Sequence, residues 1–374
     1  MKLILNFLIC ATIVATHWAV TGNAQTRPAE SGAVYAMTND ASDNRILVYS
    51  RNSNGALSFQ GSVSTQGRGS GGIIDPLQSQ GSLVLSQDSS FLFAANPGSG
   101  TITTFRVLPF GLAFVSQADS GGAEPISIAI HGNLLYVLNT ASIVGFQIQS
   151  NGRLTAISSS TQFLATVGGR DLGASDIAFN PNGNFLALTE RDANQVVVFP
   201  VETNGTLGTP IASNSNGNMP FACAFTPSGV LVVAEAAGAP RGGPAASSYA
   251  IAPSGALQVI SGSVPTQGAA ACWDIVTKDG KFGVVTNAGS SNETLFLISD
   301  AGQLSFQSIT SSGTNVTPID TALTADGLFI YTLDEAAGSI SEFRFDESSQ
   351  TLTLLGAISD GLTGNTGNQG IAAR

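Results

Sequence analysis

A chain of 374 residues, of which 43% are hydrophobic and only 10% charged, is long enough to bury a large core but poor in the Lys, Glu and Arg that coat exposed helices. The formal net charge of −11, with only 14 Lys and Arg residues, argues against nucleic acid as a partner, because nucleic-acid binding needs clustered positive charge. The 43 Gly residues favour many short strands joined by tight turns.

Residues 1–24 have the features of a secretory signal peptide. Lys2 gives the segment a positively charged N-terminal region, residues 3–20 are largely apolar, and residues 22–24 are small residues of the kind found at a signal-peptidase cleavage site. An uncleaved membrane anchor is the alternative, which the short apolar run disfavours. We therefore expect a secreted or periplasmic protein without membrane contact after cleavage, with one domain over residues 25–374.

One sequence pattern recurs seven times along this domain. An apolar strand ends in a polar residue, and a short turn then leads to a second apolar strand. The polar residues, called landmark residues below, are Asn39, Asn96, Asn139, Glu190, Glu235, Asn287 and Asp334. Their spacing of about fifty residues is typical of a β-propeller, in which each repeat forms one four-stranded sheet. The sequence therefore predicts an all-β fold, a propeller of seven blades, each with four antiparallel strands.

The two ends of the domain predict how the ring closes. The first recognisable strand, residues 33–38, corresponds to the second strand of a blade and has no inner strand before it. The last segment, residues 369–373, matches the inner strands of the other repeats. We therefore expect the C-terminal strand to complete the first blade, an arrangement that leaves few free sheet edges.

Turns before the second strands give the repeat a more specific signature. They are Pro181-Asn182-Gly183, Pro227-Ser228-Gly229, Asp279-Gly280 and Asp326-Gly327. With the Thr-Asn and Thr-Glu strand ends, these turns make the chain from Ala33 to Arg374 resemble the lactonase-like seven-bladed propellers. That family includes the 6-phosphogluconolactonases and the fungal carboxymuconate-cyclising enzymes. The resemblance implies a small lactone or sugar-acid substrate and a hydrolysis or cyclisation reaction, although a fold does not determine an activity.

The central channel of such a propeller has a mouth where a site is expected. Loops between second and third strands meet there with the starts of the inner strands, so all seven landmark residues should converge. The candidate substrate-binding landmarks are Asn39, Asn96, Asn139, Asn287 and Asp334. Alternatively, these side chains only form turns by bonding to nearby backbone. The Gly-rich segment Gly67–Gly72 lacks the Lys-Ser/Thr of a phosphate-binding loop, and we expect it to lie over the mouth.

Two glutamates and three arginines are the candidates for chemistry at the mouth. Glu190 and Glu235 are candidate catalytic acids or bases, because Glu is a poor turn former. Arg170 and Arg191 are catalytic candidates that would hold a substrate carboxylate, and Arg241 is a candidate binding residue in the loop after Glu235. The alternatives are structural glutamates and surface ion pairs of little energetic consequence.

The resemblance assigns roles to some of these positions. The muconate-cyclising relatives use a His at the start of the third inner strand, an Arg near the start of the fourth, and a Glu at the end of the fourth blade's second strand. Glu190 matches that Glu, Arg170 lies a few residues before the Arg position, and Glu124–Ser127 contains no His. The obvious general base near neutral pH is therefore missing. His131 falls in a turn at the opposite face.

The remaining groups with ligand chemistry are acids and thiols. Asp176, Asp274 and Asp320 lie in predicted inner strands and, with the two glutamates, could hold Ca²⁺ through carboxylate oxygens. Solvated acids lining the channel are the alternative, and we predict no other cofactor and no other metal. Cys223 and Cys272 lie in adjacent inner strands at different heights, and two buried free thiols are expected.

Two classes of function fit these observations. The first is a secreted lactonase-like enzyme, a monomer acting on a small molecule at the channel mouth, with Glu190 or Glu235 as acid or base. The second is a non-catalytic binding propeller that presents its mouth to a sugar, a peptide or a surface partner. The missing His counts against the first class, because it removes the obvious general base. The export signal also counts against it, because phosphogluconate metabolism is cytosolic. A perturbed pKa at Glu190 or Glu235 would favour the enzyme, and a flat mouth lined by amides, with unperturbed acids, would favour the binding propeller.

Overall fold

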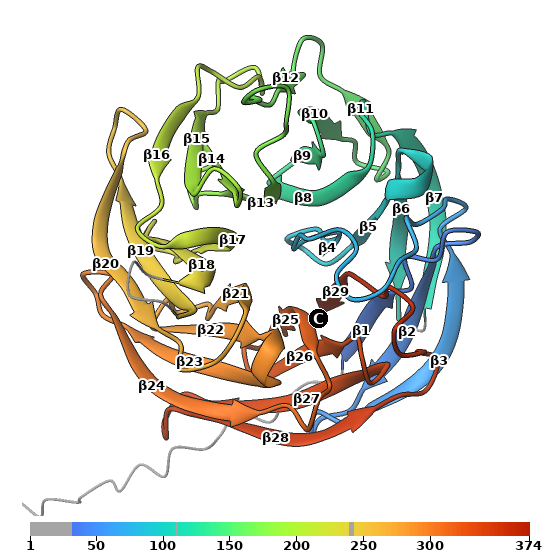
Figure 1. The fold of residues 1–374 in the computed structure, drawn as a ribbon. Helices are drawn as coiled ribbons and strands as arrows, with labels where there is room; N and C mark the ends of the chain where they lie inside the picture. The colour runs from blue at the N-terminus through green and yellow to red at the C-terminus, as the bar shows by residue number, and fades with distance from the viewer. Residues whose placement is uncertain (1–31, 110, 239–242) are drawn as a thin grey trace, which may run out of the picture.

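The computed structural model describes residues 32–109, 111–238 and 243–374, which form seven antiparallel sheets arranged as the blades of a ring around a central channel (Figure 1). Six sheets have four strands, and the third has its outer strand split into two short pieces that both pair with the same neighbour. The prediction of a seven-bladed, four-stranded antiparallel propeller is thus confirmed.

The strands follow one another from the channel outward in each blade. From inner to outer, blade 1 contains β29 (Ile371–Ala373), β1 (Gly32–Met37), β2 (Arg45–Arg51) and β3 (Leu57–Ser64). Blade 2 contains β4 (Leu83–Leu85), β5 (Phe91–Asn96), β6 (Thr101–Leu108) and β7 (Gly111–Asp119). Blade 3 contains β8 (Pro125–His131), β9 (Leu134–Asn139) and β10 (Ser142–Ile148), with β11 (Leu154–Ala156) and β12 (Gln162–Phe163) outside.

The other four blades follow the same order without interruption. Blade 4 contains β13 (Ala174–Phe179), β14 (Phe185–Glu190), β15 (Gln195–Pro200) and β16 (Ile211–Asn214). Blade 5 contains β17 (Asn218–Phe225), β18 (Leu231–Gly238), β19 (Ala245–Ile251) and β20 (Leu257–Pro265). Blade 6 contains β21 (Ala271–Val276), β22 (Phe282–Asn287), β23 (Asn292–Ile298) and β24 (Leu304–Ser311). Blade 7 contains β25 (Pro318–Leu323), β26 (Phe329–Asp334), β27 (Ser339–Asp346) and β28 (Thr351–Ile358). The helices of the described residues are two short 3₁₀ turns, η1 (Pro97–Ser99) and η2 (Ala288–Ser290).

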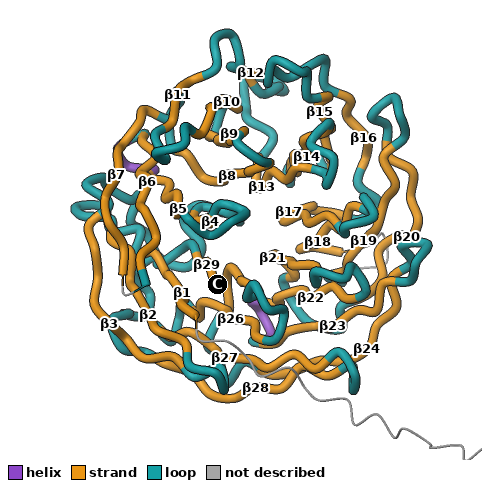
Figure 2. Tube along the Cα trace, turned by 180° about the vertical axis from the view of Figure 1, so that it is seen from behind, coloured by secondary structure: helices purple, strands orange, loops and turns teal. Residues whose placement is uncertain are grey.

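The C-terminal strand closes the ring as the sequence predicts. β29 pairs antiparallel with β1, with Ala372 opposite Tyr35, and the Arg374 amide donates to the Ala33 carbonyl over 2.9 Å. Seen from behind, the C-terminus lies beside β1 at the inner edge of the first blade (Figure 2). This pairing joins the two ends of the domain, so blade 1 contains strands from both.

Apolar side chains of the middle strands fill the spaces between adjacent blades. Tyr331 of β26 is fully buried against blade 1, where its hydroxyl donates to the Gly55 carbonyl over 2.6 Å. Gly55 has a φ of +95°, and a Cβ there would lie 2.3 Å from the Phe329 ring. The Asn-Gly turn between β2 and β3 therefore needs glycine both for its backbone and for the close contact with blade 7.

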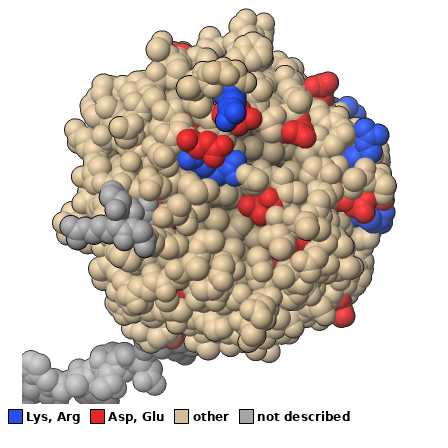
Figure 3. Space-filling model, in the orientation of Figure 1, with Lys and Arg blue, Asp and Glu red and all other residues tan. Residues whose placement is uncertain are grey.

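Other sequence predictions concern the two cysteines, the N-terminal segment and Arg241. Cys223 and Cys272 are buried free thiols, as expected. The predicted signal peptide and Arg241 lie outside the described residues. The described part of the chain has no helix that is both long and apolar enough to span a membrane. Charged side chains are sparse on the face seen in Figure 3, and several of them lie in groups that contain both signs of charge.

Candidate functional site

Five of the seven landmark residues end second strands, whereas Asn39 lies two residues beyond β1 and Glu235 lies within β18. The side chains of all seven point away from the channel. Glu190 is 2% exposed and the other six are fully buried. Their described side-chain contacts are with their own blade, with the preceding blade or with a loop that connects two blades. The amide of Asn139, for example, donates to the Ser120 carbonyl in the loop from blade 2 to blade 3. The landmark ring thus lies between blades, and these side chains do not meet at the mouth.

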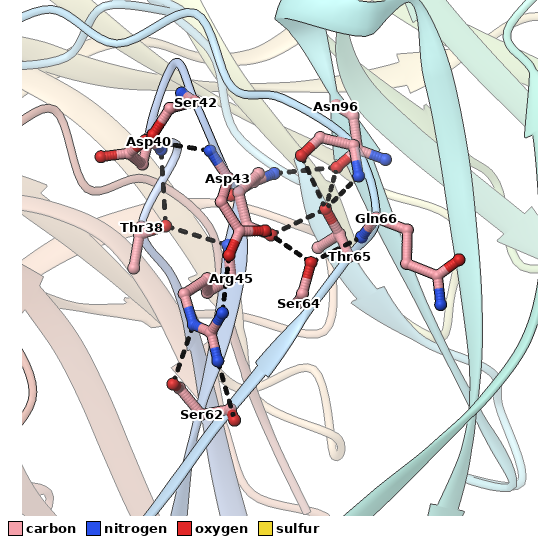
Figure 4. A network of polar contacts seen from close by, with 12 residues as sticks. Thr38, Asp40, Ser42, Asp43, Arg45, Ser62, Ser64, Thr65, Gln66 and Asn96 are labelled. Atoms are coloured by element: carbon pink, nitrogen blue, oxygen red, sulfur yellow. Dashed lines mark hydrogen bonds and ion pairs between the residues drawn. The ribbon is translucent and has the colours of Figure 1, made fainter.

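The contacts of Asn96 show what such a residue does (Figure 4). Its side-chain oxygen accepts hydrogen bonds from Thr65 Oγ1 over 2.6 Å and from Asn44 Nδ2 over 3.0 Å, both in blade 1. Its amide nitrogen donates to Thr103 Oγ1 over 2.9 Å, and that hydroxyl donates to the Thr65 carbonyl. Asn287 repeats the pattern with Thr294 in blade 6. These amides therefore connect adjacent blades.

The acidic landmark Glu235 has the same role in blade 5. Its carboxylate accepts hydrogen bonds from Ser247 Oγ over 2.6 Å, from Ser263 Oγ over 2.8 Å and from the Gly217 amide over 2.8 Å. Ser215 adds a longer contact of 3.2 Å. A buried carboxylate satisfied by so many donors is suited to stabilise the joint between blades 4 and 5.

We expect Glu235→Ala to lower the free energy of unfolding by about 3 kcal/mol, because it leaves several buried donors without an acceptor. Urea unfolding at neutral pH measures the change, and Glu202→Ala, at an exposed position in blade 4, is the matched control. A Glu235→Ala variant as stable as the control would show that this carboxylate does not hold the two blades together.

In three blades, by contrast, the residue after the landmark faces the channel mouth. A cleft of about 500 Å³ opens there, and its walls include Arg191, Ala236 and Ala288, each one position beyond a landmark. Successive side chains of a strand point to opposite sides, so this one-residue offset decides which side chains reach the cleft. Of the arginines predicted for the site, Arg191 is the one that the described residues place in this cleft.

Two further sets of residues complete the walls. The inner strands contribute Met219, Phe221, Cys272, Trp273 and Ile319, and Ala270 precedes β21. The long loop between β3 and β4 contributes Ile74, Asp75 and Gln78. Phe221 and Trp273 meet edge to face with ring centroids 5.2 Å apart, and they form the apolar side of the cleft.

The loop between β3 and β4 extends across the channel. Gln80 pairs with the backbone of Asp274 in blade 6, donating to its carbonyl over 2.7 Å and accepting from its amide over 3.0 Å. Trp273 Nε1 donates to the Ser79 carbonyl over 3.0 Å. The Gly-rich segment expected over the mouth lies at its edge, where the Gly69 amide bonds to the Asp40 carbonyl. The loop therefore reaches the inner strand of blade 6 and forms one wall of the cleft.

Asp75 lies in this loop, which sequence reasoning did not select. Its backbone has a φ of +53°, and Ile74 before it has a φ of +43°, conformations that non-glycine residues rarely adopt. Gln369, next to β29, holds the segment by donating to Asp75 Oδ1 over 2.9 Å and by accepting from the Leu77 amide. Positive φ values of this kind gather at functional sites, where the surrounding structure stabilises them.

The electrostatics of the cleft centre on Asp75 and Arg191. Burial raises the pKa of the Asp75 carboxyl to about 7, and the Gln369 hydrogen bond and the positive charge of Arg191 oppose part of that rise. Arg191 is held by hydrogen bonds to Gln78 and to the Gly173 carbonyl, and its guanidinium lies 5.7 Å from the centre of the Phe221 ring. A carboxyl group that titrates near neutral pH can act as a proton donor or acceptor.

The other predicted catalytic residues lie outside the cleft walls. Glu190 accepts a hydrogen bond from Gln195, and burial raises the pKa of its carboxyl. Arg170 is exposed in a turn, where its backbone pairs with Val167. The roles assigned to Glu190, Glu235 and Arg170 from sequence thus gain no support from proximity to the cleft.

Three acids of the inner strands are buried around the channel. Burial raises the pKa of Asp176 to about 7 and holds those of Asp274 and Asp320 well above their usual value. Neither carboxyl oxygen of Asp274 has a hydrogen-bond partner among the described residues. In the same part of the chain, no group of three or more His, Cys, Asp or Glu side chains is placed to hold a metal ion.

Comparison with known proteins agrees with this architecture. A crystal structure of a protein from Lactobacillus plantarum has a TM-score of 0.73 at 18% identity, covering 92% of this chain and 99% of that one. A putative 6-phosphogluconolactonase from Bacteroides fragilis has a TM-score of 0.71 at 17% identity, covering 94% and 99%. A periplasmic gluconolactonase from Pseudomonas aeruginosa has a TM-score of 0.67 at 18% identity, covering 91% and 99%. At these identities the likeness shows the fold.

No curated protein has a sequence that matches this chain. The family model described as "Lactonase, 7-bladed beta-propeller" matches residues 42–167, 140–272 and 250–361, which together span most of the domain. The sequence repeats, the ring of seven blades and this match agree, and the chain belongs to the family of seven-bladed β-propeller lactonases.

Proposed function

We propose that this chain hydrolyses a lactone at the channel mouth, with Asp75 as acid and base and Arg191 as the group that binds the reacting carbonyl. The observation that carries the proposal is the position of a carboxyl with a pKa near neutrality beside a guanidinium in one largely apolar cleft. Membership of the lactonase family supports the reaction class. Perturbed titratable groups in a cleft are a recognised sign of an active site.

The reaction needs one water molecule and no other reagent. The Asp75 carboxylate accepts a proton from water, and the water oxygen forms a bond to the lactone carbonyl carbon. The carbonyl oxygen becomes negative and is stabilised by the Arg191 guanidinium. The ring C–O bond then breaks, and the proton held by Asp75 passes to the leaving alkoxide. The product is a hydroxy acid, and Asp75 returns to its ionised form. Cyclisation of a hydroxy acid is the same path in reverse.

The cleft also supports the substrate-binding role of Arg191 that the sequence predicts. Its two neighbours, Gln78 and Phe221, fix the guanidinium before any ligand binds, which reduces the cost of ordering it. Asp75 takes the place that the sequence assigned to Glu190 or Glu235, because those carboxylates are buried between blades. Export remains part of the proposal, supported by the residues before the domain.

We expect Arg191→Gln to lower kcat/KM at least about 100-fold on lactones that the wild-type protein hydrolyses, because the negative charge formed at the carbonyl oxygen loses its counter-charge. Hydrolysis of a panel of γ- and δ-lactones by the chain from residue 25 onward measures the effect. The matched control is Arg170→Gln, an exposed arginine outside the cleft. Urea unfolding of both variants checks that the fold is retained.

Two outcomes would contradict the proposal. If the wild-type protein hydrolyses no lactone above the spontaneous rate, the enzymatic proposal fails for that panel, and a binding propeller becomes the better explanation. If Arg170→Gln loses activity and Arg191→Gln does not, hydrolysis occurs but the site lies elsewhere on the same face.

A further inference from the structure

We infer that the ligand of the mouth cleft is a lactone with an alkyl or aryl substituent, together with its hydroxy acid, and not a sugar lactone or a phosphorylated one. As an assignment of substrate class, the inference rests on the proposed function, although the chemistry of the cleft walls can be tested without turnover. Three features of these walls carry it.

The first feature is the apolar character of the walls. Nine of the twelve lining residues are apolar, and they include the aromatic side chains of Trp273 and Phe221. Both aromatic side chains are almost completely buried by neighbouring blades, so they form a fixed surface. Ala236 and Ala288 give space without offering side-chain hydrogen bonds. Such a surface favours hydrocarbon, because each methylene moved out of water strengthens binding about fourfold.

The second feature is the shortage of free polar groups. Asp75 already accepts a hydrogen bond from Gln369, and Gln78 accepts one from Arg191. A sugar lactone carries a hydroxyl on most carbons, and each hydroxyl moved into a cleft without a partner opposes binding. The three polar lining residues cannot satisfy that many hydroxyls while they are paired with one another and with Gln369.

The third feature is the positive charge. Among the described residues lining the cleft, Arg191 is the one cation, and the acid Asp75 lies in the same cleft. One guanidinium matches the carbonyl oxygen of a lactone and the carboxylate of its product. A phosphate ester would bring about two negative charges in addition to the product carboxylate, beside an acid and within a protein of net charge −11.

The rim of the cleft continues the apolar surface outward. Ile73 is 69% exposed, Ile74 46% and Met219 39%, and the last two line the cleft itself. Large apolar side chains that stay exposed next to an apolar cleft favour an alkyl or aryl group extending from the mouth.

A fluorescence titration tests the inference without requiring catalysis. The sequence contains two Trp residues, Trp18 and Trp273, so the chain from Gln25 onward has Trp273, in the cleft wall, as its single tryptophan. We would titrate it at pH 6.5 with 4-hydroxydecanoate, gluconate and 6-phosphogluconate. We expect 4-hydroxydecanoate to bind at least tenfold more tightly than either sugar acid.

Variants connect the preference to the cleft. Met219→Gln should weaken binding of 4-hydroxydecanoate at least threefold and leave gluconate binding unchanged. Val259→Gln, at an exposed position in the outer strand β20, should change neither. Sugar-acid binding as tight as that of 4-hydroxydecanoate, no binding of 4-hydroxydecanoate, or equal effects of the two variants would overturn the inference.

The outcomes separate this inference from the proposed function. Selective binding of 4-hydroxydecanoate without hydrolysis of its lactone would uphold the ligand class and defeat the proposal of catalysis. Hydrolysis of δ-gluconolactone in preference to alkyl lactones would uphold catalysis and overturn the ligand class.

Discussion

Asp75→Asn is expected to lower kcat at least about 100-fold on any lactone that the protein hydrolyses, with little change in KM. Asparagine keeps the size of the side chain and can retain the contact with Gln369, but it cannot accept the proton that water must lose. Steady-state hydrolysis measures the effect. Asp192→Asn, which changes an exposed acid next to Arg191, is the matched control and should keep wild-type kinetics.

The pH dependence of hydrolysis gives an independent check on the same residue. Because the carboxylate form is the active base and the pKa of Asp75 is raised to about 7, wild-type kcat/KM should rise with pH through about 7. Arg191 lowers this pKa, so Arg191→Gln should move the rise to higher pH. A profile that stays flat between pH 5 and 9, or an Asp75→Asn variant with full kcat, would rule out Asp75 as the base.

The fold could be predicted from the sequence because its signals are local and repeated. Each blade carries its own alternating strands and its own Gly-containing turn, so a misread element is corrected by its counterparts in other blades. Closure of the ring by the C-terminal strand could also be predicted, because residues 369–373 repeat the inner-strand pattern that the first blade lacks. β29 pairs with β1 for this reason.

The site was harder to predict, for two physical reasons. The first is strand alternation: five of the landmark residues mark strand ends, but in three blades it is the next residue that lines the cleft, as Arg191 does. The second is that contacts remote in sequence place Asp75. It is held by Gln369, almost three hundred positions away, and its loop is anchored by Gln80 on Asp274. No local pattern shows such contacts, although an acid within a long Gly-rich loop was a signal that could have been followed.

The position at which the muconate-cyclising relatives have a His shows why family roles do not transfer directly. In this chain the segment carries Ser127, a buried residue whose hydroxyl donates to Asp176 over 2.9 Å. The inner strand of blade 3 therefore binds blade 4 at a place where the resemblance implies a catalytic base. The identities of 17 to 18% to solved structures show that the chain shares their fold, and they do not transfer the role of any single residue.

The protein should be more stable at pH 5 than at pH 8, by on the order of 3 kcal/mol or more in the free energy of unfolding. Five deeply buried acids contribute to this effect together with Asp75, because burial raises the pKa of each above its unfolded value. They are Asp176 and Glu293, each at about 7, Asp334 at about 8, and Asp274 and Asp320 well above their usual value.

The direction of this pH dependence of stability follows from proton binding. Above about pH 4 the unfolded chain releases these protons, whereas the folded protein retains each of them until the pH passes the raised pKa, about 7 for Asp176 and Glu293 and about 8 for Asp334. The folded state therefore binds more protons over this range, and stability falls as pH rises. Acids with a lowered pKa, such as Asp326, act in the opposite direction, but only below about pH 4, where unfolded carboxyls titrate. Over pH 5 to 8 the buried acids therefore determine the slope.

Urea unfolding at several pH values between 5 and 8 measures this slope. Asp274→Asn should flatten it and raise stability at pH 8, because both carboxyl oxygens of Asp274 lack partners among the described residues and an amide carries no charge to bury. Asp300→Asn, an exposed substitution in blade 6, should leave the slope unchanged. Stability that rises from pH 5 to 8 would mean that ion-paired carboxylates dominate and that the buried acids are ionised in the folded protein. Burial thus opposes negative charge at Asp274 and Asp320 in the channel, whereas Asp75 at the mouth keeps a carboxyl that ionises near pH 7.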